Sequence, residues 1–79
     1  MTVAVIGGDG RPMQGVDAGA RRYASPGDGG NGELRRLEAA LRAGSIDRMI
    51  ILARWNSHSA TRKLRRLCKR LRIEVEVWA

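Results

Sequence analysis

Two short, unbroken apolar runs most constrain what this chain can fold into. Val3–Ile6 reads VAVI and is followed by two glycines, and residues 49–53 read MIILA. Neither run alternates between polar and apolar residues, so each is expected to be a strand covered on both faces, as in a parallel sheet. Helical patterns separate the strands, and the sequence therefore predicts an α/β fold with right-handed crossovers.

Apolar residues at helical spacing mark two helices. The first is predicted over residues 32–43, with Asn31 as a candidate N-cap and Gly44 just past its end, where glycine is favoured. The second helix starts near one of three N-cap candidates, Asn56, Ser57 and Ser59. Its apolar stripe consists of Ala60, Leu64, Leu67 and Leu71.

The chain closes with residues 73–78, which alternate between apolar and acidic residues up to Trp78 and so predict an edge strand. For the three predicted strands, in chain order, we expect the parallel arrangement 2-1-3. This order places one helix on each face, as in a small three-layer Rossmann-like or flavodoxin-like domain. The alternative order, 1-2-3, places both helices on one face. Either order leaves apolar surface uncovered, which predicts a homodimer with Trp78 as a contact, unless Trp78 folds back on the core.

Composition limits the class of protein. A chain of 79 residues forms a single domain with a thin core, and its one cysteine leaves no disulfide to support it. The lone thiol and the absence of a signal-like opening predict a cytoplasmic protein, and no apolar run is long enough to span a membrane. The formal charge is +7, of which +2 belongs to residues 1–59 and +5 to residues 60–79. This local excess indicates an anionic partner, although it also fits a solvated surface.

A glycine-rich loop, predicted to be flexible over about residues 8–31, separates the first strand from the first helix. Ligands of parallel α/β sheets bind at the carboxyl ends of the strands, and helix N-termini there favour anions. The sequence predicts an anion site built from Gly7, Gly8, Asp9, Gly10, Arg11, Arg54, Ser57, His58 and Ser59. The same residues also fit a tight turn and a helix cap, because GGDG matches neither a phosphate loop nor a dinucleotide fingerprint.

His58 and Cys68 are the residues whose chemistry would suggest a metal or a nucleophile. Ten helical residues separate them by about 15 Å along the axis, so they do not share one ion or one proton. Cys68 lies beside the apolar stripe and is expected to be a small core residue. His58 is the only histidine, so no metal set or catalytic triad is completed, and neither a metal nor a cofactor is expected.

The second helix carries a dense set of cations: Arg62, Lys63, Arg65, Arg66, Lys69, Arg70 and Arg72. Pairs four residues apart repel each other by about 0.2–0.5 kcal/mol, and no acidic residue within the helix offsets them, although Glu74 and Glu76 are close enough in sequence to do so. Contact with a phosphate backbone explains this pattern without base recognition. A solvated face is the alternative.

The motifs VAVIGG, ID followed by IIL, and SH with nine residues before CK occur together with a closing strand. In this combination the chain resembles the small bacterial domain-of-unknown-function family two-three-two-five over nearly its whole length. The resemblance implies a Rossmann-like or flavodoxin-like domain in which Ser57 and His58 matter beyond capping. Members of that family tend to carry a further histidine near the middle loop, where this chain has residues 25–28, SPGD. This departure argues against a two-histidine metal or haem site.

From these patterns we expect a non-enzymatic domain of residues 1–79 that binds an anion or nucleic acid, or an acidic protein. The alternatives are a small hydrolase or phosphoryl-transfer protein that uses His58 with Arg11 and Ser57, and a protein-interaction module that acts as a homodimer.

Overall fold

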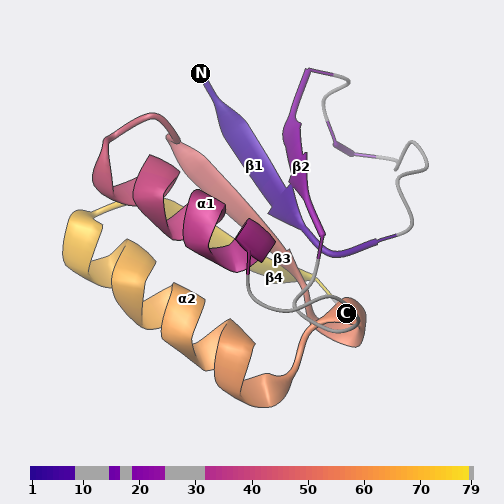
Figure 1. The fold of residues 1–79 in the computed structure, drawn as a ribbon. Helices are drawn as coiled ribbons and strands as arrows, with labels where there is room; N and C mark the ends of the chain where they lie inside the picture. Colours follow the sequence, from indigo (N-terminus) through magenta and orange to yellow (C-terminus); the bar gives the residue numbers. More distant parts are fainter. Residues whose placement is uncertain (9–14, 17–18, 25–31, 79) are drawn as a thin grey trace.

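A computed structural model describes residues 1–8, 15–16, 19–24 and 32–78, and it contains a parallel four-stranded sheet with two helices (Figure 1). The strands are β1 (Val3–Ile6), β2 (Arg21–Tyr23), β3 (Arg48–Leu52) and β4 (Glu74–Trp78), and their order in the sheet is β2-β1-β3-β4. The helices are α1 (Gly32–Arg42) and α2 (His58–Leu71), and a short 3-10 turn, η1 (Ala53–Trp55), links β3 to α2. The predicted α/β class is therefore confirmed.

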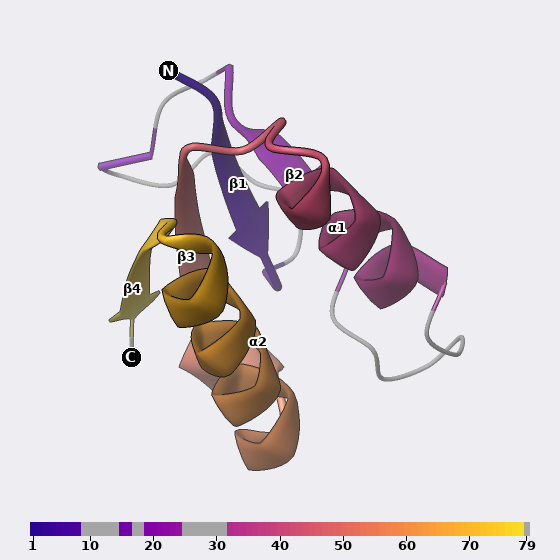
Figure 2. The ribbon, with the colours of Figure 1, turned by 90° about the vertical axis from the view of Figure 1, so that its left-hand side faces the viewer.

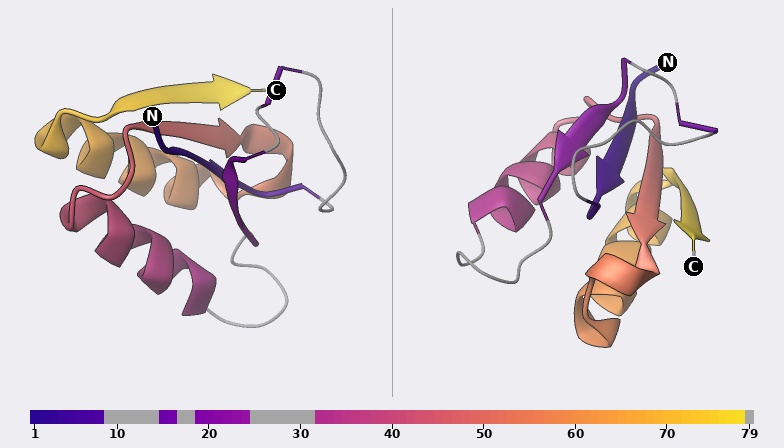
Figure 3. Two further views of the ribbon diagram at one scale, coloured as in Figure 1. Left: turned by 90° about the horizontal axis from the view of Figure 1, so that it is seen from above. Right: turned by 90° about the vertical axis from the view of Figure 1, so that its right-hand side faces the viewer.

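Both helices lie side by side on one face of the sheet (Figures 2 and 3). Their leucines meet the apolar side chains of one strand face, namely Ala4, Ile6, Met49 and Ile51. These four side chains are completely buried, as are Leu37, Leu41 and Leu64 of the helices. Burial of one leucine side chain stabilises the folded state by about 1.5–3 kcal/mol. This layer is therefore the main source of stability in such a small domain.

The predicted strand order 2-1-3 is wrong. The three predicted strands are β1, β3 and β4, and they are adjacent in chain order. The connections from β2 to β3 and from β3 to β4 move in the same direction across the sheet, and right-handed crossovers then place α1 and α2 on the same face. The predicted helix on each face is wrong for the same reason.

Strand β2 was missed because its sequence, RRY, has no apolar pattern. It forms inside the predicted glycine-rich loop because its backbone pairs in parallel with β1, with Tyr23 opposite Ile6. The amide of Gly7 extends this pairing by donating to the carbonyl oxygen of Tyr23 at 2.9 Å. The prediction of three strands is therefore corrected to four. Residues 9–14, 17–18 and 25–31 of the predicted loop lie outside the described residues.

The second face of the sheet carries a smaller apolar cluster of Val5, Ile50 and Leu52. Strand β2 lies on the opposite side of β1 from β3 in the sheet, and residues 7–20 connect β1 to β2. Val16 and Ala20 from that connection pack on the cluster, and Trp78 packs there as well. Trp78 therefore folds back on the core, and it no longer favours a homodimer. Self-association of the chain stays a prediction.

The helix ends follow the sequence signals. Ser57 is the N-cap of α2, where its Oγ accepts a hydrogen bond from the amide of Ala60 at 3.0 Å. Gly44 follows α1 with a φ of +76°, the left-handed conformation expected of a glycine past a helix end. At the end of α2 the same conformation is taken by Arg72, with φ 60° and ψ 40°, and this was not predicted.

Candidate nucleic-acid interface

The carboxyl ends of β1 and β3 meet where the strand order reverses, which is the usual ligand crevice of a parallel α/β sheet. In this protein the side chain of Asn56 bridges the two strands. Its Nδ2 donates to the carbonyl oxygen of Leu52 at 2.8 Å and to that of Ile6 at 3.2 Å. Its Oδ1 is buried without a hydrogen-bond partner. Asn56 therefore holds the ends of β1 and β3 together through its side chain. The sequence suggested only a helix cap for this residue.

Gly7 is required at this junction by packing. Its φ is +107°, and a Cβ placed on it would lie 2.8 Å from the Cβ of Trp55 and 3.1 Å from Nδ2 of Asn56. Its amide is already bonded to Tyr23, as described above, and is not free for an anion. The glycine at this position thus allows the end of β1 to approach η1 closely.

The other predicted anion-site residues divide into two groups. Asp9, Gly10 and Arg11 lie outside the described residues. Gly8, Arg54, Ser57, His58 and Ser59 all lie at the carboxyl edge of the sheet, and all except Gly8 are well exposed. Ser57 Oγ lies 3.5 Å from Ser59 Oγ in addition to capping α2. The anion site itself stays a prediction.

His58 is exposed on the first turn of α2 and contacts Arg62. Nη2 of Arg62 lies 3.1 Å from Nε2 of His58. A guanidinium has only donors, so Nε2 must accept, and the ring carries its proton on Nδ1. This occupies the nitrogen that a general base would use. Among the described residues, no group of three or more His, Cys, Asp or Glu side chains is arranged to hold a metal ion.

Cys68 is completely buried in the main core, between α2 and the sheet. Burial raises the pKa of its thiol, because an apolar environment disfavours the thiolate. The prediction that Cys68 is a core residue is confirmed.

The outer surface of α2 is the most strongly charged part of the described chain. The seven cations predicted to bind nucleic acid lie on α2 or, for Arg72, at its C-cap. All of them are exposed: Arg62, Lys63, Arg65, Arg66, Lys69, Arg70 and Arg72. Within the part of the chain that the structure describes, only Lys63 has a carboxylate partner, Glu38 of α1, with 3.2 Å between Nζ and Oε1. We call the other six the basic face.

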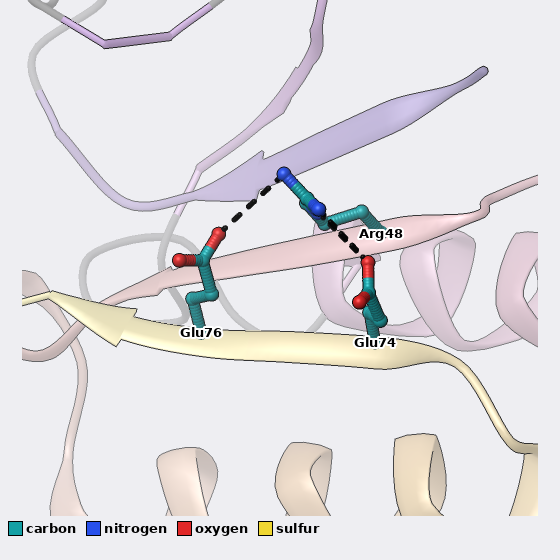
Figure 4. A network of polar contacts seen from close by, with 3 residues as sticks. All are labelled: Arg48, Glu74 and Glu76. Carbon is teal, nitrogen blue, oxygen red and sulfur yellow. Dashed lines mark hydrogen bonds and ion pairs between the residues drawn. The ribbon is translucent and has the colours of Figure 1, made fainter.

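Glu74 and Glu76 do not neutralise the basic face. Their side chains bind Arg48 of β3 on the opposite side of the sheet from α2 (Figure 4). Arg48 donates to Oε2 of Glu74 from both Nε, at 3.1 Å, and Nη2, at 2.9 Å, and its Nη1 lies 3.9 Å from Oε2 of Glu76. The hydrogen bond to Glu74 is the main cause that raises the pKa of Arg48. The sequence left open that these glutamates relieve part of the repulsion on α2, and their pairing with Arg48 argues against it.

The charge of the whole chain resides in this one segment. Residues 62–72 contain seven of the 15 Lys and Arg residues and none of the 8 Asp and Glu residues. The remaining eight cations and eight anions cancel. The arrangement separates a cationic helix from a neutral remainder.

Two grooves flank α2 and share Arg62 and Arg66. The first, of about 350 Å³, lies between the helices and has Glu38 and Arg42 of α1 on its far wall. The second, of about 470 Å³, lies between α2 and β4, where Arg65 and Lys69 stand beside Ile73 and Val75. Cations thus line both sides of the helix. Arg42 was not predicted to belong to this surface, because it becomes part of it only through the packing of α1 against α2.

The fold and this surface define a small parallel α/β domain with a cationic helix. Comparisons of the chain with models of known families, with curated proteins and with solved structures found no match. The resemblance to family two-three-two-five therefore stays a prediction. No helix in the described part of the chain is long and apolar enough to cross a membrane.

Proposed function

We propose that the protein binds nucleic acid through the phosphate backbone, with the basic face of α2 as the contact surface. One observation carries the proposal: six exposed cations on residues 62–72 have no carboxylate partner among the described residues, while the nearest acidic residues in sequence bind Arg48 on the other side of the sheet.

The arrangement of these cations is costly for an isolated domain. Arg62 and Arg66, and likewise Arg66 and Arg70, are four residues apart on one helix, where like charges repel by about 0.2–0.5 kcal/mol for each pair. Arg72 adds strain, because a left-handed conformation costs a residue with a Cβ about 1–2 kcal/mol. A polyanion that neutralises several of these charges at once, with release of its counterions, reverses the first cost.

Backbone contact fits this surface better than base recognition. Arg62, Arg66 and Lys69 follow one another at helical spacing along the outer side of α2, over about 10 Å at 1.5 Å per residue. Phosphate contacts set position and affinity, and they carry no direct sequence information. The proposed binding is therefore sequence-independent and strongly dependent on salt.

The test is a comparison of two triple variants that lose the same charge. In the first, Arg62, Arg66 and Lys69 are changed to Gln, and in the control, Arg22, Arg35 and Arg36 are changed to Gln. Affinity for a labelled duplex is measured by fluorescence anisotropy over a range of salt concentrations. We expect the first variant to reduce the slope of log K against log salt by up to about 2.7, at roughly 0.9 for each lost phosphate contact. The control is expected to keep the wild-type slope.

Equal slopes in both variants would show that net charge alone drives binding and that α2 is not the contact surface. Absence of binding by the wild-type protein at low salt would overturn the proposal. Circular dichroism of each variant checks that the helices remain folded.

The hydrolase and phosphoryl-transfer alternatives lack a comparable observation. Within the described residues His58 contacts Arg62 and has no carboxylate partner. The described residues therefore supply no carboxylate that would orient His58 as a general base.

A further inference from the structure

Trp55 is the one aromatic side chain among the described residues that stands well out of the core, with 47% of its surface exposed. Tyr23 and Trp78 are both partly buried against the core clusters. An exposed indole offers a flat apolar ring and a polar N–H group to a partner.

The backbone that carries Trp55 is held firmly. Asn56 ties the end of η1 to β1 and β3 through the two hydrogen bonds described above, and its amide donates to the carbonyl oxygen of Ala53 at 3.3 Å. On the other side, the Cβ of Trp55 abuts Gly7 so closely that no other residue fits there. The exposed ring of Trp55 thus stands on an anchored backbone and offers a platform for stacking.

This platform lies at the start of the basic face. Trp55 is three residues before His58, which opens α2 and contacts Arg62. His58, Arg62, Arg66 and Lys69 then follow one another along the outer side of the helix at spacings of four, four and three. Arg54, beside Trp55, is exposed as well. The chain thus places an exposed aromatic residue directly before the helix that carries the row of cations.

From this juxtaposition we infer that the nucleic acid is single-stranded, and that one of its bases stacks on Trp55 while the adjoining phosphates contact Arg62 and Arg66. This inference rests on the proposed function and specifies the class of ligand. Proteins that bind single strands without sequence preference combine a cationic track with aromatic rings on which bases stack. A duplex offers phosphates to the basic face but keeps its bases stacked inside, out of reach of Trp55.

The chain contains two tryptophans, so Trp78→Phe leaves Trp55 as the only indole. Fluorescence of this variant is followed during titration with an oligothymidylate of about ten nucleotides, a length within the range of known single-strand sites. An abasic strand of the same length, which has the same phosphates and no bases, is the matched control. We expect the oligothymidylate to quench Trp55, and the abasic strand to bind with little quenching.

A second measurement avoids any dependence on Trp78. Trp55→Ala keeps the Cβ that contacts Gly7 and removes only the ring. We expect it to weaken binding of the oligothymidylate by about tenfold or more, in keeping with the contribution of one stacked base. Its affinity for the abasic strand is expected to stay at the wild-type value.

The outcomes separate this inference from the proposed function. If both strands bind with equal affinity and neither quenches Trp55, the basic face contacts phosphate and the stacking inference is wrong. If Trp55→Ala weakens both strands equally, Trp55 acts on the fold of the site and the inference is again wrong. If neither strand nor a duplex binds at low salt, the proposed function falls and this inference falls with it.

Discussion

Arg48 and Glu74 face each other across β3 and β4, with 2.9 Å between Nη2 and Oε2, on the side of the sheet that α2 does not cover. The register of the two strands decides this position, because Glu74, Glu76 and Trp78 all point to the same face. Strand β4 is acidic and follows the basic helix α2 in sequence. Its glutamates nevertheless lie on the face of the sheet away from α2 and do not neutralise the helix.

This relationship predicts different effects for two acidic residues, Glu38 and Glu74. Glu38→Gln frees Lys63 and removes a negative charge from the groove between α1 and α2. We expect affinity for nucleic acid at low salt to rise by up to about fivefold, since an ion pair whose lysine is exposed, as Lys63 is, is worth about 1 kcal/mol at most. Glu74→Gln changes the formal charge equally, but on the far face, and is expected to have a smaller effect in the same anisotropy assay. Equal gains from both variants would contradict this account of the surface.

Gly7→Ala tests the contact between β1 and η1. The added Cβ would lie 2.8 Å from the Cβ of Trp55, in a backbone with a φ of +107°. We expect a loss of about 3 kcal/mol in the free energy of unfolding, from left-handed strain of about 1–2 kcal/mol and overpacking of about 1–3 kcal/mol. Urea unfolding followed by circular dichroism measures the loss.

Gly44→Ala is the control for this experiment. Gly44 also has a positive φ, of +76°, but nothing lies within 4 Å of an added Cβ. Its loss is expected to be limited to strain, at about 1–2 kcal/mol. Equal losses at both positions would show that crowding at Gly7 is unimportant.

Arg72→Gly is expected to stabilise the fold while weakening binding. Arg72 ends α2 in a left-handed conformation, in which glycine is favoured by about 1 kcal/mol. The same change at Arg70, inside the last turn of the helix, is expected to cost about 1 kcal/mol. We expect the urea midpoint to rise for Arg72→Gly and to fall for Arg70→Gly, and we expect both variants to bind nucleic acid more weakly. This result would support the view that Arg72 is retained for its charge. A lower midpoint for Arg72→Gly would contradict it.

Cys68 gives the fold a dependence on alkaline pH. Burial raises the pKa of its thiol in the native state, so the unfolded chain, in which a thiol ionises near pH 8.5, loses the proton first as the pH rises. The contribution of Cys68 to stability is therefore complete below about pH 8 and falls above it, by at most about 1.4 kcal/mol per pH unit. Urea unfolding of the wild type and of Cys68→Ala at several pH values measures this contribution as the difference between them. We expect the difference to shrink as the pH rises, and a constant difference would contradict the assignment.

The helices and three strands were predictable because their signals are local. Leucines at helical spacing, a serine cap at Ser57 and the glycine after α1 specify each helix within its own segment. Strand β2 has no such signal, because RRY becomes a strand only when β1 offers it a backbone edge. The sequence did not predict the strand order either. An apolar strand such as β3 is compatible with any pair of neighbouring strands, so its own residues do not specify which strands lie beside it.

The candidate site was predictable only in part, for the same reason. Clustered cations on α2 are visible in the sequence, but whether Glu74 and Glu76 neutralise them depends on strand register. The bridging role of Asn56 depends on the ends of two strands that are 46 residues apart in the chain, Ile6 and Leu52. Contacts of this kind arise from tertiary structure, and no spacing rule reveals them.

The confinement of all excess charge to residues 62–72 affects the orientation in which the protein approaches a polyanion. A cationic helix on a neutral remainder gives the molecule a large electric dipole moment that points toward α2. In the field of a polyanion this moment turns the protein before any contact forms, so that most encounters begin with α2 leading. Orientation of this kind raises the rate of productive association, and it fades as ions shorten the screening length.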